Sequence, residues 1–207
     1  GMRPDYPTIV YSRILKRLFP DTPIIVGGIE ASMRRLTHYD YWQDKLLPGI
    51  LADCPADLLI YGMGERPIIE IARRLQQGEN IKQLDDIPQT ASMQPLSNMP
   101  RVTEDEGNIV LASHEERKQS ENFKHIEEES NKYHAKRLWQ SVGERAIMVN
   151  PPYPPMTETE IDASFDLPYT RMPHPKYKGK TIPAYEMIKF SVNLHRGCFG
   201  GCAFCTI

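Results

Sequence analysis

The first eighty residues alternate between helix-like and strand-like patterns, and this alternation constrains the fold more than any other feature. Residues 5–19 carry apolar side chains close to helical spacing, with Asp5 as the expected N-cap. A short buried strand is predicted at Ile24–Val26, followed by two glycines and good helix formers. Residues 58–61 and 67–77 then repeat the strand and the helix. This order predicts an α/β protein with a parallel sheet.

Glycine pairs follow both predicted strands. Gly27 and Gly28 come after the first strand, and Gly62 and Gly64 come after the second. Backbone amides at such turns can bind phosphate, but neither turn has the full G-x-G-x-x-G pattern of a dinucleotide site. We therefore expect tight turns within an α/β sheet.

The pattern changes after residue 80. Residues 81–108 indicate a connection with Pro and Ser, followed by a short strand in the sequence GNIVLAS. The highly charged residues 115–139 predict a long solvated helix with a thin apolar stripe. A Pro-rich extended segment from residue 150 contains one short helix, which Thr157 and Glu160 begin with a capping box. Residues 187–194 predict a strand that leads directly into a group of cysteines.

Charge and hydropathy narrow the classes of partner. The formal net charge is −2 and the pI is about 6.3, which gives no signal for nucleic acid or for an anionic membrane. The longest apolar runs are far shorter than a membrane-spanning helix requires, and there is no secretion signal. The cysteines are not spread as in a secreted disulfide framework. We expect a cytoplasmic protein.

Three of the four cysteines form the motif C-x3-C-x2-C near the carboxyl end, at Cys198, Cys202 and Cys205. Thiolates are soft ligands that favour zinc, copper(I) and iron–sulfur clusters. A structural zinc site or an ordinary ferredoxin cluster needs four protein ligands. Three cysteines leave one iron of a cluster open to a small molecule. The alternatives are a zinc site with His195 as fourth ligand, a disulfide with a free thiol, and an unligated structural cluster.

This motif, with Phe204 before its third cysteine, resembles the cluster loop of the radical S-adenosylmethionine superfamily. The resemblance implies that the three cysteines each hold one iron of a 4Fe-4S cluster. S-adenosylmethionine would then bind the fourth iron through its amino and carboxylate groups, with Phe204 beside the adenine. Gly197, Gly200 and Gly201 fit a loop that wraps closely around a cluster, because glycine permits unusual backbone angles.

The chain is similar more specifically to the YgiQ-type group of radical S-adenosylmethionine proteins. The similarity lies in the sequences GGIEASMRRLTHYDYW, ADLLIYGMGERP, RMPHPKY, IPAYEMIKFSVN and RGCFGGCAFC. It implies that residues 1–80 form the C-terminal part of a Rossmann-like, cobalamin-binding-like domain. Residues 81–185 would be an irregular, Pro-rich connecting region, and residues 186–207 the first strand and cluster loop of a truncated partial (β/α) barrel. The D-x-H-x-x-G signature of cobalamin binding is absent from the sequence, so cobalamin is not implied.

The same resemblance implies an activity. A reduced cluster would pass one electron to S-adenosylmethionine and generate a 5′-deoxyadenosyl radical, which removes hydrogen from a substrate that the sequence does not identify. An electron donor would be a required partner. Because the group's members are longer, we expect this chain to be a piece of a radical enzyme that is inactive alone. A non-catalytic binding module with structural zinc remains the alternative.

The sequence HYDYW, at residues 38–42, is the other dense group of chemically active side chains. His38 and Asp40 could handle protons beside a substrate, but aromatic packing beside a helix end is the simpler expectation. Glu65 and Arg66 are expected to pair or to cap the following helix. His174 and the isolated Cys54 are expected to be structural.

Overall fold

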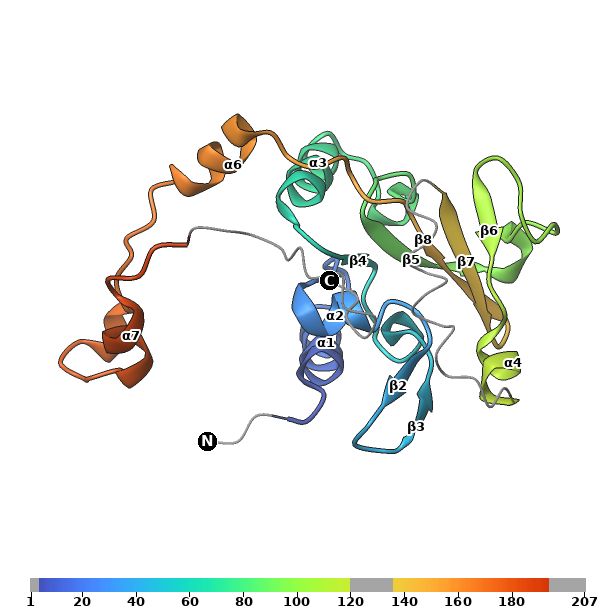
Figure 1. The fold of residues 1–207 in the computed structure, drawn as a ribbon, viewed down its shortest axis with the longest axis horizontal. Coiled ribbons are helices and arrows are strands. Elements are labelled where there is room, and N and C mark those ends of the chain that lie inside the picture. The colour runs from blue at the N-terminus through green and yellow to red at the C-terminus, as the bar shows by residue number, and fades with distance from the viewer. Residues whose placement is uncertain (1–3, 120–135, 194–207) are drawn as a thin grey trace. The chain divides into compact units, whose positions relative to one another are not determined.

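The computed structural model of the chain describes residues 4–119 and 136–193. It divides into two compact units, with one unit running to Pro154 and the other starting at Pro155. The larger unit is an α/β structure built on a six-stranded sheet (Figure 1). Within the described ranges, no helix is long and apolar enough to cross a membrane.

The sheet has the strand order β1-β4-β5-β8-β7-β6. Its strands are β1 (Ile25–Val26), β4 (Leu58–Ile60), β5 (Thr90–Pro95), β6 (Asn108–Val110), β7 (Arg137–Val142) and β8 (Arg145–Val149). The predicted parallel pairing is confirmed for β1 with β4, where Ile25 faces Leu58. β6 and β7 are also parallel, whereas β4–β5, β5–β8 and β8–β7 are antiparallel. The α/β class is therefore confirmed in a mixed sheet.

Helices cover both faces of the sheet at the β1–β4 end. α1 (Pro7–Leu18) and α2 (Gly28–Met33) contribute Ile9 and Ala31 to the core cluster that contains Leu59. α3 (Glu65–Gln76) contributes Ile71 to the opposite cluster, beside Leu58. Alternate residues of β4 thus point to different helices, and α3 lies across the strand from α1 and α2 in Figure 1. The three helices predicted within residues 1–80 are confirmed.

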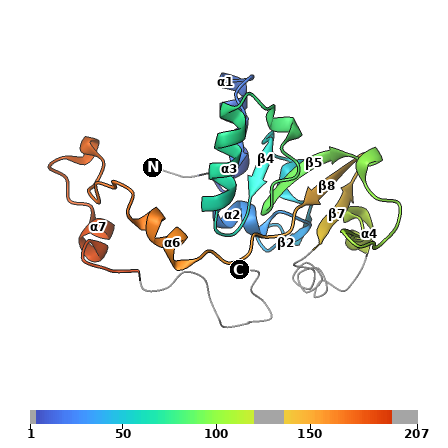
Figure 2. The same ribbon diagram turned by 90° about the horizontal axis from the view of Figure 1, so that it is seen from above.

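The sheet continues well beyond residue 80, where a domain boundary was expected. β5, β7 and β8 were not predicted. For β5 and β7 the reason is that their sequences, TASMQP and RLWQSV, mix polar and apolar residues. These strands form through pairing with residues far away in sequence. Ala91 of β5 pairs with Val149 of β8, and Leu138 of β7 pairs with Val149 from the other side. Figure 2 shows β5, β8 and β7 side by side.

The prediction of one helix over residues 115–139 is wrong at its carboxyl end. α4 (His114–Gln119) begins as expected, with Ser113 and Glu116 bonded to each other across its first turn. Residues 137–139 instead belong to β7, where Trp139 is 5% exposed and donates its indole N–H to Asn108 Oδ1 at 3.0 Å. Burial of that ring between strands outweighs the local helical spacing. The part from 120 to 135 lies outside the described residues.

Short elements complete the larger unit. The strands β2 (His38–Asp40) and β3 (Lys45–Leu47) form an antiparallel hairpin with His38 opposite Leu47. Three short 3-10 helices, η1 (Ile50–Ala52), η2 (Ile81–Gln83) and η3 (Leu96–Asn98), lie in the connections. The expected N-cap at Asp5 is wrong, because the α1 cap position is Tyr6 and makes no side-chain cap bond.

The smaller unit consists of short helices in a Pro-rich segment. α6 (Glu158–Phe165) starts with the predicted capping box, in which Thr157 Oγ1 accepts from the Glu160 N–H at 3.3 Å. η4 (Pro175–Tyr177) and α7 (Pro183–Ile188) follow. The strand expected at residues 187–194 is wrong over 187–193, because residues 187–188 belong to α7 and the rest pair with no described strand. A Lys189–Glu186 ion pair of 2.6 Å bridges the last turn of this helix.

Asn150 joins the end of β8 to the segment before β5. Its side-chain amide donates to the carbonyls of Asp85 and Ile87 at 2.8 and 3.0 Å, and it lies 3.1 Å from Thr90 Oγ1. The side-chain oxygen of Asn150, Oδ1, accepts a hydrogen bond from Arg137 Nε at 2.8 Å. Because Asn150 is only 2% exposed, water cannot replace these partners.

We therefore expect Asn150→Asp to lower the free energy of unfolding by about 2–4 kcal/mol at pH 7, because a buried carboxylate would face carbonyl oxygens. Urea unfolding followed by circular dichroism measures this change. Asn98→Asp is the matched control, since Asn98 is exposed and its amide makes one bond, to Gln94 Oε1 at 3.2 Å. Equal losses in the two variants would contradict the proposed role of Asn150.

Candidate functional site

The residues predicted to hold a cofactor lie outside the described residues, in the range 194–207. They are Cys198, Cys202 and Cys205 for the metal, and Gly200, Gly201 and Phe204 for the cofactor. Their roles remain predictions. Across residues 4–119 and 136–193, no three His, Cys, Asp or Glu side chains lie together as a metal site. Cys54 is a free thiol buried in the main core, as expected of a structural cysteine.

The carboxyl ends of β1 and β4 form the edge of the sheet at which α/β proteins bind ligands. Both ends carry glycines in the left-handed region, Gly28 at φ +82° and Gly62 at φ +66°. A Cβ atom at Gly28 would meet nothing within 4 Å, so its backbone angle, rather than lack of space, favours glycine. The expected tight turns are confirmed at this edge.

Gln89 fixes the turn after β4, a role that the sequence did not indicate. Its side-chain amide donates to the carbonyls of Tyr61 and Met63 at 2.8 and 2.5 Å. The side-chain oxygen of Gln89, Oε1, accepts a hydrogen bond from the Tyr153 N–H at 3.3 Å. Gln89 itself has φ +64° and is 7% exposed. One buried side chain therefore ties the glycine turn to the segment that follows β8.

Two arginine–tyrosine pairs flank this turn. The Arg35 guanidinium lies 4.9 Å from the centre of the Tyr61 ring, and that of Arg66 lies 5.7 Å from the Tyr153 ring. Arg66 also donates to the Pro154 carbonyl at 2.6 Å. Such cation–π contacts stabilise the edge and place positive charge beside it. Arg66 thus contacts the segment after β8 rather than acting only as a helix cap.

Tyr61 is a hydrogen-bond donor at this edge rather than an acid or base. Its hydroxyl donates to the Asn150 carbonyl at 2.6 Å. Burial raises the pKa of Tyr61 to about 12, although the nearby Arg35 partly opposes this effect. The phenol therefore stays protonated throughout the neutral range.

Asp40 anchors the β2–β3 hairpin from inside the protein. It is 3% exposed, its Oδ1 accepts from the Gln43 N–H at 2.9 Å, and Arg34 lies 3.9 Å from its Oδ2. Burial acts to raise the pKa of Asp40, but the hydrogen bonds from Gln43 and Tyr6 and the charge of Arg34 together lower it. Asp40 is therefore an ionised structural group at neutral pH.

The aromatic residues of the hairpin are exposed, contrary to the expected packing beside a helix end. Tyr41 and Trp42 are 67% and 72% exposed, and their ring centroids are 4.6 Å apart. Tyr39 donates its hydroxyl to Asp44 at 2.5 Å. Because the loop residues Tyr41–Asp44 turn the chain between two strands, these rings project from the tip instead of joining the core.

His38 and His114 lie near each other at the base of this hairpin. The ring of His114 is 3.1 Å from Thr37 Oγ1 through Nδ1, and the His38 Nδ1 is 3.2 Å from the Leu36 carbonyl. Since a carbonyl only accepts, His38 Nδ1 carries the proton. Burial lowers the pKa of both histidines, and the charges of Arg34 on His38 and Lys118 on His114 act in the same direction.

These lowered pKa values predict a stability that depends on pH. Because the unfolded chain binds protons more readily than the folded one, stability is complete above the ordinary histidine pKa and falls as the pH drops below about 6.5. The expected slope between pH 6.5 and 5 is at most about 1.4 kcal/mol per pH unit for each histidine. His38→Asn should reduce the slope of the urea-unfolding free energy against pH.

The control is His174→Asn, because His174 is exposed and its Nδ1 accepts only a local bond from the Lys176 N–H at 3.2 Å. This variant should leave the slope unchanged. An unchanged slope in the His38 variant would instead show that its protonation is not linked to folding.

Comparison with known proteins adds to this geometry. The family model described as Radical SAM N-terminal matches residues 1–191, which is most of the chain. A UPF0313 protein of Porphyromonas gingivalis is 65% identical over all of this chain. UPF0313 proteins of Bacteroides thetaiotaomicron and Geobacter sulfurreducens are 60% and 45% identical over all of it.

The matched region is only part of these relatives. The chain covers 33% of the Porphyromonas protein, 35% of the Bacteroides protein and 34% of the Geobacter protein, or about one third of each. No solved structure matches the chain.

Proposed function

The chain belongs to the Radical SAM N-terminal family, and from this membership we propose that its cysteine motif serves the reductive cleavage of S-adenosylmethionine. The observation that carries the proposal is the C-x3-C-x2-C spacing of Cys198, Cys202 and Cys205 in a chain of this family. The substrate of the whole protein is left open.

The donor set fits a 4Fe-4S cluster. Three thiolates fill three of the four ligand positions that such a cluster needs and leave the fourth for S-adenosylmethionine. When bound, the cluster supplies the electron that breaks a carbon–sulfur bond of S-adenosylmethionine, giving methionine and a 5′-deoxyadenosyl radical. A reducing cytoplasm, which keeps thiols free, suits this chemistry.

The other residues of the motif have positioning roles in this proposal. Gly200 and Gly201 let the backbone between the first two cysteines turn closely around the bound group. Phe204 offers an aromatic face to the adenine of S-adenosylmethionine. In the described α/β unit, Gln89 and Arg66 hold residues 153 and 154, from which the chain continues toward the cysteines.

We expect anaerobic reconstitution of a protein that contains this chain and spans the full length of its relatives to give about four irons per protein. The triple variant C198A/C202A/C205A should lose this iron and the visible absorbance of the cluster, because no cysteine of the motif remains. Cys54→Ala is the control: it removes the buried core thiol and should keep the iron. Metal analysis would contradict the proposal if it found one tightly bound zinc and no iron, as a structural zinc site requires.

The same reconstituted protein tests the reaction. With a strong reductant and S-adenosylmethionine, chromatography should detect 5′-deoxyadenosine and methionine in equal amounts, and the triple cysteine variant should form neither. Iron loading without any 5′-deoxyadenosine would restrict the motif to cluster binding.

A further inference from the structure

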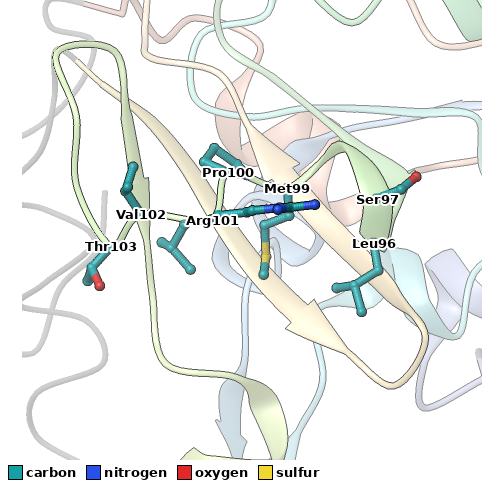
Figure 3. Close-up of a pocket in the computed structure, with 8 residues that line it drawn as sticks. Leu96, Ser97, Met99, Pro100, Arg101, Val102 and Thr103 are labelled. Carbon is teal, nitrogen blue, oxygen red and sulfur yellow. The ribbon is translucent and has the colours of Figure 1, made fainter.

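A pocket lies beside the β5–β6 connection, away from the carboxyl ends of β1 and β4. It has a volume of about 430 Å³ and is lined by residues of η3, the segment that follows it, and β6. Figure 3 shows Met99 and Arg101 over the strands, with Leu96 at one end and Thr103 at the other. This volume is in the range of small-molecule sites.

The floor of this pocket is built into the core. Met99 and Val110 pack against Trp139 and Met148 on β7 and β8. The lining segment is tied at both ends, because the Met99 N–H donates to the Leu96 carbonyl at 3.1 Å and the Val110 N–H donates to that of Thr103 at 2.7 Å. A ligand would therefore meet a largely preformed surface, which lowers the entropic cost of binding.

Arg101 is the charged residue in the lining. It is exposed, and its guanidinium makes no hydrogen bond or ion pair with residues 4–119 or 136–193. Two of the three acids that follow it in sequence, Glu104 and Asp105, are engaged elsewhere. Glu104 pairs with Lys136 at 2.7 Å, and Asp105 Oδ1 accepts from the Gly107 and Asn108 N–H groups at 2.8 and 2.7 Å. The pocket thus presents an exposed guanidinium, with no protein partner in the described ranges, beside apolar side chains.

We propose that this pocket binds a small organic anion that carries an apolar body and one carboxylate. The Arg101 fork matches a carboxylate in two parallel hydrogen bonds. Leu96, Met99 and Val110 supply apolar surface for the remainder of the ligand. A cation would be repelled, and a neutral apolar molecule would gain no hydrogen bond or ion pair from the guanidinium.

The competing role for Arg101 is to cover the apolar floor with its aliphatic stem. That role depends on the stem and not on the charge. Arg101→Met keeps an unbranched apolar side chain and removes the charge. Arg101→Lys keeps the charge but cannot form the bidentate hydrogen bonds of a guanidinium. The two variants therefore separate anion binding from simple coverage.

The probe is 3-phenylpropionate, titrated into the 15N-labelled 207-residue chain at pH 7.5. Acetate lacks the apolar body, and 3-phenylpropanamide lacks the charge. We expect amide chemical-shift changes at residues 96–99, 101–103 and 110, with 3-phenylpropionate binding at least tenfold more tightly than either comparator. Arg101→Met should weaken its binding at least tenfold, and Arg101→Lys should weaken it less.

The proposal is overturned if 3-phenylpropionate shifts none of these amides at 10-fold molar excess and above, up to its solubility. It is also overturned if the amide binds as tightly as the acid, or if Arg101→Met binds like the unaltered chain. For each variant, the circular dichroism spectrum and the Trp139 indole N–H resonance are recorded without ligand. If both are unchanged, the variant is folded and any lost binding is due to the substitution itself. Arg101→Lys, which keeps the positive charge, is measured in the same way as Arg101→Met.

Discussion

The buried amide of Asn150 holds together the parts of the larger unit that are far apart in sequence. It connects the end of β8 with the carbonyls of residues 85 and 87 and with Arg137 on β7. The following residue, Pro151, accepts the Gln89 N–H at 2.7 Å, and Gln89 in turn holds the glycine turn after β4. The carboxyl edge of the parallel strands thus depends on a hydrogen-bonded chain that begins in the antiparallel half. Buried polar groups of this kind favour one arrangement, because any alternative leaves them unpaired.

Local sequence was sufficient wherever a short apolar run ended in glycine. The strands at Ile25–Val26 and Leu58–Ile60 were predictable for this reason, as were the three helices around them. β5 was not, because Thr90 and Ser92 are buried polar residues of a strand whose partners, β4 and β8, lie between 30 and 58 residues away in sequence. The segment 187–193 has strand-like composition, yet composition alone does not form a strand without a hydrogen-bonded neighbour.

The candidate site shows the same division. The cysteine motif is a matter of spacing within eight residues, so a cluster site can be predicted from it without any knowledge of the fold, and it stays a prediction. Gln89 and Arg101 could not be found in this way. Each acquires its role from neighbours brought together by the sheet: Tyr61 and Tyr153 for Gln89, and the floor on β7 for Arg101.

The two tryptophans occupy opposite environments, and this gives the molecule two separate optical reporters. Trp42 is 72% exposed beside Tyr41, whereas Trp139 is 5% exposed and donates its indole N–H to Asn108. An aqueous quencher reaches the first ring directly, while the second emits at shorter wavelength from an apolar setting. Intrinsic fluorescence can therefore distinguish an event at the hairpin tip from one at the β7–β8 face, without any added label.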